Sequence, residues 1–110
     1  MDVYNTRPIE EVDKLTFKEI MRNRKIEVSP HAFDHLSEKQ RKVFKEEDLV
    51  HMLEKEVPRK IYLQNNGRYA SYFRKSDGYR KLILEIEDNI IIIVTFIDTP
   101  EIPKVKLKND

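Results

Sequence analysis

The spacing of apolar positions changes near Pro58, and this change predicts helices before that residue and strands after it. Before Pro58 the apolar residues recur at intervals of three and four, which is typical of one face of a helix. The pattern predicts helices over 8–22, 29–41 and 46–56 and a short strand over 25–28. Pro8 suits the first helical position, and Ser29 followed by Pro30 is a helix start with an N-cap and a proline at N1.

After Pro58 short apolar or aromatic runs alternate with turn residues, which predicts a meander of strands. The predicted strands are 60–64, 68–75, 79–87 and 90–97. Residues 65–67 (Asn-Asn-Gly) and 76–78 (Ser-Asp-Gly) supply turns, because Asn and Gly tolerate positive φ. The last strand is apolar at consecutive positions, so both of its faces should be covered and it should lie inside the sheet.

The face on which each strand residue lies follows from the pairing across the second turn, where we expect Lys75 opposite Tyr79. With that pairing, strict alternation directs one set of side chains toward the helices. That set is Ala70, Tyr72, Leu82, Leu84 and Ile86. The set on the opposite face is Tyr69, Ser71, Phe73, Lys81, Ile83 and Glu85. A slip of one residue in the pairing would change these partners.

The predicted order of helix, strand, two helices and four-stranded meander is typical of an α+β domain with helices on one sheet face. A chain of 110 residues is one domain with a modest core. We expect the core to span about 26–97. An N-terminal helical extension over 1–24 should precede it, and a frayed tail over 104–110 should follow it.

Composition narrows the classes of function. Charged residues make up 37% of the chain, cysteine is absent and the net charge is +1. Without cysteine there is no disulfide, thiol nucleophile or thiolate metal site. The first six residues lack the apolar stretch of a signal peptide, and the longest apolar run, 90–94, is shorter than the ~20 residues that span a bilayer. We expect a cytoplasmic protein with no membrane contact and no cofactor.

The segment 58–84 carries a net charge of +6 in a protein whose total charge is +1. Its basic residues are Arg59, Lys60, Arg68, Arg74, Lys75, Arg80 and Lys81, against one acidic residue, Asp77. The aromatic residues between them are Tyr62, Tyr69, Tyr72, Phe73 and Tyr79. Basic and aromatic side chains together on a sheet can hold the phosphates of a polyanion and stack its bases. Three other interpretations stay open: protection against edge-to-edge aggregation, ion pairs with the acidic helix over 46–56, or binding of an acidic segment from a partner protein.

Two histidines, His31 and His35, lie four residues apart on the second predicted helix and would point the same way. Zinc-binding helices use this spacing, but the string His-Ala-Phe-Asp-His lacks the glutamate of such sites and no third ligand is evident, so we expect no metal site. His31 should be at least partly exposed, either as a surface residue or as a general acid or base acting on a bound polyanion. His51 is expected to be solvated.

A family resemblance rests on the string Val28-Ser-Pro-His-Ala-Phe-Asp-His-Leu36, followed by Arg41 and the acidic helix over 46–56. This pattern, with Val-Thr at 94–95 near the end of the last strand, resembles small domains grouped with RelE-like and BrnT-like toxins. The resemblance covers about 26–95. It implies a RelE-like α+β fold, in which an antiparallel sheet of four to five strands carries two helices on one face. The helix over 8–22 has no counterpart there and would be an extra N-terminal helix.

The resemblance also implies action on RNA, because many RelE-like proteins are metal-independent endoribonucleases. His31 matches the family pattern and would be the general acid or base, although His35 stands where the family more often has Arg. Arg41 corresponds to the arginine that follows and would stabilise the developing charge. Lys81 is a third catalytic candidate, nominated from the composition of the basic segment and not from the resemblance. The nucleic-acid contacts nominated from the basic segment are Arg68, Tyr69, Arg74, Tyr79 and Arg80.

A toxin of this kind could have an antitoxin or another protein partner, but the sequence does not say whether one is present. Two other functions stay open at this point. The chain could be a non-catalytic protein-interaction or oligomerisation domain that uses the basic and aromatic strands, or an inactive member of the family.

Overall fold

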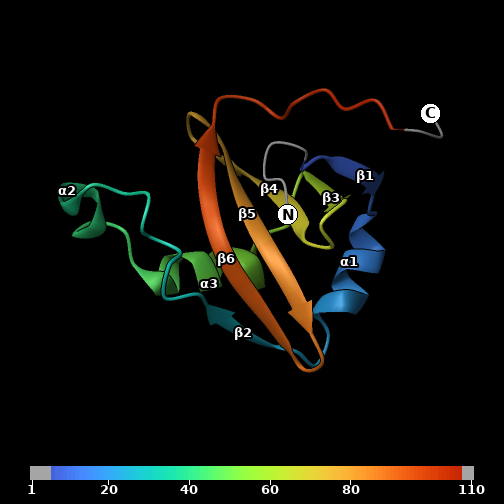
Figure 1. Cartoon of the computed structure of the whole chain (residues 1–110), viewed down its shortest axis with the longest axis horizontal. Coiled ribbons are helices and arrows are strands. Elements are labelled where there is room, and N and C mark those ends of the chain that lie inside the picture. The colour runs from blue at the N-terminus through green and yellow to red at the C-terminus, as the bar shows by residue number, and fades with distance from the viewer. Residues whose placement is uncertain (1–5, 108–110) are drawn as a thin grey trace.

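The computed structural model describes residues 6–107, which form one sheet with two helices packed on one of its faces (Figure 1). The helices are α1 (Lys14–Met21), α2 (Glu38–Arg41) and α3 (Glu46–Lys55). The strands are β1 (Pro8–Glu11), β2 (Lys25–Val28), β3 (Lys60–Gln64), β4 (Tyr69–Lys75), β5 (Gly78–Glu87) and β6 (Ile90–Thr99). Residues 1–5 of the expected N-terminal extension and 108–110 of the expected tail lie outside the described residues.

The α+β class is confirmed, but the sheet differs from the expected one. Its described part has six strands in the order β1-β3-β4-β5-β6-β2, rather than four or five. The sheet is mixed, because β2 pairs with β6 in parallel while the other neighbours are antiparallel. The meander β3 to β6, the short strand β2 and the helix α3 were all predicted. β6 lies between β5 and β2, so its expected place inside the sheet is confirmed.

The predicted helix over 8–22 is wrong in its first part, where β1 forms an edge strand beside β3. Proline is tolerated at a sheet edge because its missing N–H need not face a neighbouring strand. The helix begins instead after Asp13, whose carboxylate accepts a hydrogen bond of 2.7 Å from the backbone N–H of Thr16. That N-cap lowers the pKa of Asp13. Phe17 is only 4% exposed, so α1 packs into the main core.

The predicted helix over 29–41 is also wrong, because most of this segment is a series of turns. Ser29 caps a turn rather than a helix: its hydroxyl accepts from the N–H of His31 at 3.2 Å, and its carbonyl accepts from Ala32 at 3.0 Å. Only α2 is helical, where Ser37 and Gln40 form a reciprocal capping box. The segment 29–41 therefore contains two residues that could cap a helix, Ser29 and Ser37, and only Ser37 is followed by a helical turn.

The register of the β4–β5 hairpin differs by one residue from the predicted one. Lys75 pairs with Gly78 rather than Tyr79, so the turn has two residues instead of three. As a result Phe73 faces the helices together with Leu82, whereas Tyr72 lies on the other face. The predicted face assignment for β4 is therefore reversed, as a slip of one residue requires.

Two apolar clusters cover the two faces of the sheet. The larger cluster lies under the helices and includes Phe17, Leu49, Leu53, Ile61, Phe73, Leu82, Leu84, Ile91, Ile93 and Phe96. The smaller cluster on the opposite face consists of Tyr62, Ala70, Tyr72 and Ile83. Ile102 and Val105 pack against this smaller cluster, so the chain after β6 crosses that face (Figure 1, red trace).

Candidate nucleic-acid interface

The sheet face opposite the helices gathers most of the basic and aromatic side chains of the meander. We call it the tail face, because the C-terminal tail crosses it. Its residues are Lys60, Tyr62, Arg68, Ala70, Tyr72, Arg74, Tyr79, Lys81, Ile83 and Glu85. The alternation of strand side chains places these residues together, since neighbours along each strand point to opposite faces.

Two cations on the tail face rest on tyrosine rings. The Arg74 guanidinium carbon lies 5.1 Å from the ring centroid of Tyr79, and its Nη1 donates a 3.1 Å hydrogen bond to the carbonyl of Gly78. The Lys81 ammonium lies 5.7 Å from the ring centroid of Tyr72. No ion pair found within residues 6–107 includes Arg74 or Lys81. Burial lowers the pKa of Lys81 and raises that of Tyr72.

Two other cations of the tail face are neutralised within the protein. Arg68 Nε lies 3.2 Å from Glu85 Oε1, and Lys60 Nζ lies 3.0 Å from Glu11 Oε2. The hydrogen bond from Lys60 to Glu11 raises the pKa of Lys60. These partners come from strands. The acidic residues of α3, considered above as partners for the basic segment, take no part in these ion pairs.

Two of the nominated nucleic-acid contacts lie on the helix face instead. Arg80 forms a bidentate ion pair with Asp98, at 2.7 and 3.0 Å, and its side chain is only 11% exposed. Its guanidinium also lies 5.0 Å from the ring centroid of Phe44 and 5.1 Å from that of Phe96. Tyr69 packs partly buried against the main core. Arg80 therefore fastens the segment before α3 to the sheet.

The three nominated catalytic residues are not brought to one surface. His31 Nδ1 lies 2.9 Å from Asp34 Oδ2, and the His31 side chain is 80% exposed. Arg41 donates to the carbonyls of Asp34 and Leu36 at 3.1 and 3.2 Å, so it holds the same loop. This loop lies on the helix side of the sheet, whereas Lys81 lies on the tail face. His31 and Arg41 are therefore neighbours through Asp34, and Lys81 is separate from them.

His35 lies in the same loop and packs edge-on against Phe96, with ring centroids 5.0 Å apart. Beside it is a small cavity of about 260 Å³, lined mainly by His35, Gln40, Phe44, Phe96 and Asp98. The carboxylate of Asp98 already accepts hydrogen bonds from Arg80 and Lys75, so the charged group of this cavity has its partners within the protein. Within residues 6–107 no three His, Cys, Asp or Glu side chains are grouped closely enough to hold a metal ion.

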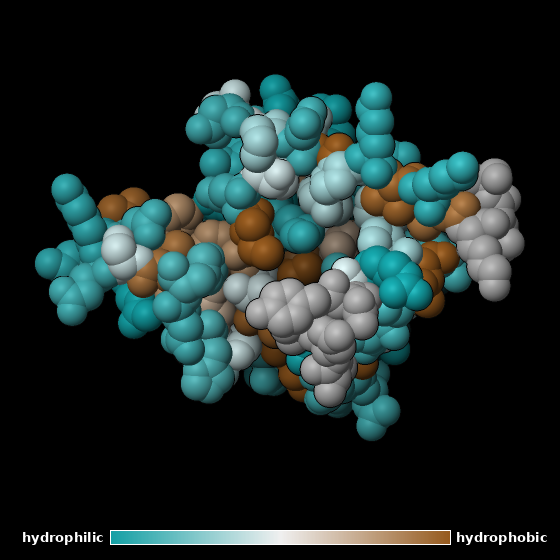
Figure 2. Space-filling model, turned by 45° about the horizontal axis from the view of Figure 1, so that its top comes forward, coloured by the Kyte–Doolittle hydropathy of each residue, from teal (hydrophilic) through white to brown (hydrophobic). Residues whose placement is uncertain are grey.

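Sequence reasoning missed two cations that belong to the tail. Lys104 and Lys106 are exposed and flank Val105, whose side chain packs on the tail-face cluster. The signal was present in the sequence, where apolar residues at 102 and 105 alternate with lysines. Figure 2 shows charged and polar residues over much of one side of the molecule, with apolar residues visible between them.

No protein-family model matches this chain, and no curated protein or solved structure matches it. The similarity to RelE-like domains therefore stays an interpretation of the motifs. Among residues 6–107 there is no helix with the length and apolar character needed to cross a membrane.

Proposed function

We propose that this protein binds single-stranded RNA on its tail face. The observation that carries the proposal is the pair Arg74 and Lys81, which lie on one surface without a carboxylate partner among the described residues. A half-buried lysine without a counter-charge is unfavourable, because burial disfavours its charged form. A phosphate bound beside Lys81 would supply the missing counter-charge and stabilise the charged form.

The side chains of the tail face divide into two roles. Arg74 and Lys81, with Lys104 and Lys106 of the tail, are the phosphate contacts. Tyr79 is half-buried and carries the Arg74 guanidinium over its ring, so the two planar groups together are the platform for a base. Tyr62 and Tyr72 are each only 5% exposed, which leaves little ring surface for a base. Tyr72 lies under Lys81, and Tyr62 packs edge-on against Tyr72.

The proposal is for binding and not for cleavage. A general acid or base must reach hydrogen-bond distance of the atom it serves. His31 and Arg41 lie on the helix side and Lys81 on the tail face, so one bound phosphate could not contact all three. Endoribonuclease activity stays a prediction of the resemblance, and incubating labelled RNA with the protein, with and without EDTA, would test it.

The test of binding is fluorescence anisotropy with a labelled single-stranded RNA over a series of salt concentrations. Replacing Arg74 with alanine or Lys81 with methionine should each reduce the slope of log K against log[salt] by about 0.7, the value for one phosphate contact on a single strand. Tyr79→Ala should weaken binding by roughly 1–3 kcal/mol with little change in slope, because it removes stacking and no charge.

Arg22→Ala is the matched control. Arg22 is an exposed arginine that follows α1, lies 2.9 Å from Glu19 and is remote from the tail face. It should leave both affinity and slope unchanged. Absence of RNA affinity at low salt, or an equal effect of Arg22→Ala and Arg74→Ala, would overturn the proposal. Tighter binding of an acidic peptide than of RNA would indicate that the tail face binds a protein partner instead of RNA.

A further inference from the structure

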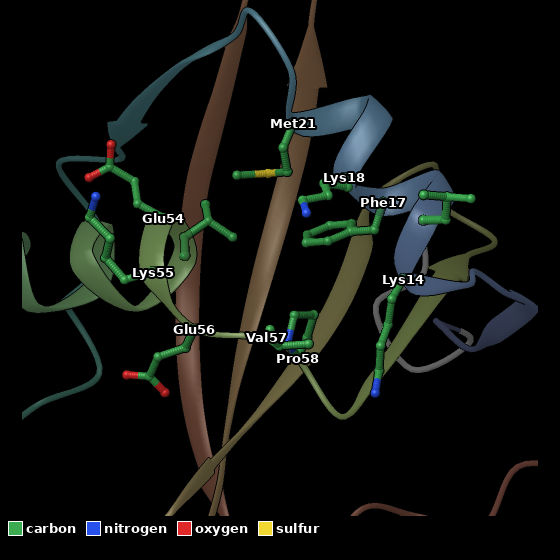
Figure 3. A pocket seen from close by; sticks show the side chains of 11 residues that line it. Lys14, Phe17, Lys18, Met21, Glu54, Lys55, Glu56, Val57 and Pro58 are labelled. Carbon is green, nitrogen blue, oxygen red and sulfur yellow. The ribbon is translucent and has the colours of Figure 1, made fainter.

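The helix layer leaves a groove between α1 and α3. These helices pack on the same face of the sheet, and α2 projects away from it (Figure 1). A cavity of about 480 Å³ opens between α1 and the end of α3 (Figure 3). Its floor is apolar and includes Phe17, Met21, Leu53 and Pro58. The groove lies on the opposite side of the sheet from the tail face.

Two exposed apolar side chains stand at this groove. Leu15 of α1 is 73% exposed and Val57, just after α3, is 68% exposed. Single exposed apolar residues are ordinary on a protein surface, but a contiguous apolar patch with a charged rim marks an interaction site. Here the exposed pair adjoins an apolar floor, so the groove and its rim form one continuous apolar surface.

The two walls of the groove carry opposite charge. Lys14 and Lys18 line the α1 side (Figure 3). The α3 side carries Glu54, Lys55 and Glu56, which leaves an excess of one negative charge. A surface with one basic and one acidic wall is complementary to itself when the two copies are oriented so that unlike walls meet.

We propose that a second copy of this chain docks on the groove, related to the first by a twofold axis that runs parallel to the groove. A rotation about that axis places α1 of each copy opposite α3 of the other, so each basic wall meets an acidic wall. A twofold axis across the groove would instead place like walls together. Leu15 and Val57 of each copy would then be covered by the apolar surface of the other.

The groove is lined by 11 residues in each copy, fewer than the roughly 20–30 residues a side of a standard stable interface. We therefore expect a weak dimer that forms in a concentration-dependent way. The tail faces of the two copies would both point away from the interface. RNA binding and dimerisation are consequently separable, and the failure of one leaves the other untouched.

Sedimentation velocity on the full chain, over about a hundredfold range of concentration at low salt, tests the proposal. Wild-type protein should shift from monomer to dimer across this range. Leu15→Glu should stay monomeric, because it puts a charge into the apolar surface. Val43→Glu is the matched control: Val43 is 71% exposed but is not part of the groove, so this variant should dimerise like wild type.

Charge reversal tests the orientation. The double variant Lys14→Glu, Lys18→Glu has two acidic walls, and the double variant Glu54→Lys, Glu56→Lys has two basic walls. Each should be monomeric alone, and an equimolar mixture should form a heterodimer. All four substituted side chains are exposed, so circular dichroism should show wild-type folding for both variants.

Three results would overturn the proposal: monomeric wild type at every concentration, equal behaviour of Leu15→Glu and Val43→Glu, or a mixture of the charge variants that stays monomeric. The first would leave the groove to a different protein. The third, with intact wild-type dimerisation, would show that the charged walls do not meet in the dimer.

Discussion

The ion pair between Arg80 and Asp98 should contribute more to stability than any other ion pair described above, and Asp98→Asn tests this. The Asp98 carboxylate accepts two hydrogen bonds from Arg80 and lies 3.2 Å from Lys75 Nζ. The substitution keeps the shape of the side chain and removes its charge. Because the Arg80 side chain is only 11% exposed, water cannot fully replace the lost carboxylate.

The magnitude follows from the burial of the two partners. Removing one partner of a fully buried ion pair costs about 3–5 kcal/mol. Asp98 is 37% exposed, and asparagine still offers one acceptor oxygen, so we expect a loss of about 2 kcal/mol in the free energy of unfolding. For a domain of this size that loss lowers Tm by roughly 10 °C. Urea unfolding followed by circular dichroism measures the free energy of unfolding of the wild-type protein and of Asp98→Asn.

Asp77→Asn is the matched control, because Asp77 lies at the same distance, 3.2 Å, from the same lysine, Lys75. Its side chain is 79% exposed, so the pair should be worth less than about 0.5 kcal/mol. Similar losses for Asp77→Asn and Asp98→Asn would show that burial of Arg80 does not strengthen its ion pair. That result would refute the reasoning.

The same pair predicts a pH dependence. Hydrogen bonding from Arg80 holds the pKa of Asp98 below its ordinary value of 3.8, and Lys75 acts in the same direction. A carboxylate whose pKa is lowered on folding stabilises the protein above its unfolded-state pKa, and the stabilisation is lost as pH falls through the folded-state value. The difference in stability between wild type and Asp98→Asn should therefore be complete at pH 5–7 and shrink as pH falls below about 3.8.

Two further predictions concern the β4–β5 hairpin and the tail face. Gly78→Ala should reduce the free energy of unfolding by about 2–3 kcal/mol, because φ is +146° and a Cβ would lie 2.6 Å from the Thr99 carbonyl oxygen. Gly67→Ala, with φ of +85° and open space around it, should reduce it by about 1 kcal/mol. Chemical denaturation of both variants tests this ranking, and equal losses would contradict it. The RNA affinity of the wild-type protein should fall as pH rises through the lowered pKa of Lys81, at a lower pH than for a lysine with the ordinary pKa of 10.5. Lys81→Arg should keep its affinity over that range. Identical pH profiles of the two proteins would contradict a role for Lys81.

Local patterns predicted those elements whose signals lie within their own residues. The apolar run of β6, the turns of the meander and the apolar stripe of α3 all act over a few positions, and all three were found. β1 has no such signal, because its four residues become a strand only through pairing with β3, about fifty residues later. The turns over 30–36 likewise depend on packing against Phe96, which no local rule contains.

The site could be predicted in composition but not in arrangement. The sequence identified the basic and aromatic segment, and Arg74, Tyr79 and Lys81 do share one surface. Arg80, nominated with them, lies on the other face of the sheet, because neighbouring residues of a strand point to opposite faces. Which face each takes depends on the register at Gly78, and that register depends on a tight turn and on the close approach of Thr99.

The ion pairs within the protein reduce the number of cations that are available to RNA phosphates. This reduction gives a quantitative prediction for the wild-type protein. The sequence offers seven basic residues within 58–84, which at about 0.7 for each phosphate contact would give a salt slope near 5. Four of these seven, Lys60, Arg68, Lys75 and Arg80, are already paired with carboxylates.

On the tail face the cations outside those pairs are Arg74 and Lys81, joined by Lys104 and Lys106 of the tail. Four contacts give an expected slope of about 3 rather than 5. A measured slope near 5 would mean that RNA competes successfully for the paired cations, and Glu85→Gln would then raise the slope no further. A slope near 3 that rises by about 0.7 in Glu85→Gln would mean that carboxylates within the sheet, and not the number of basic residues, set the binding charge of this face.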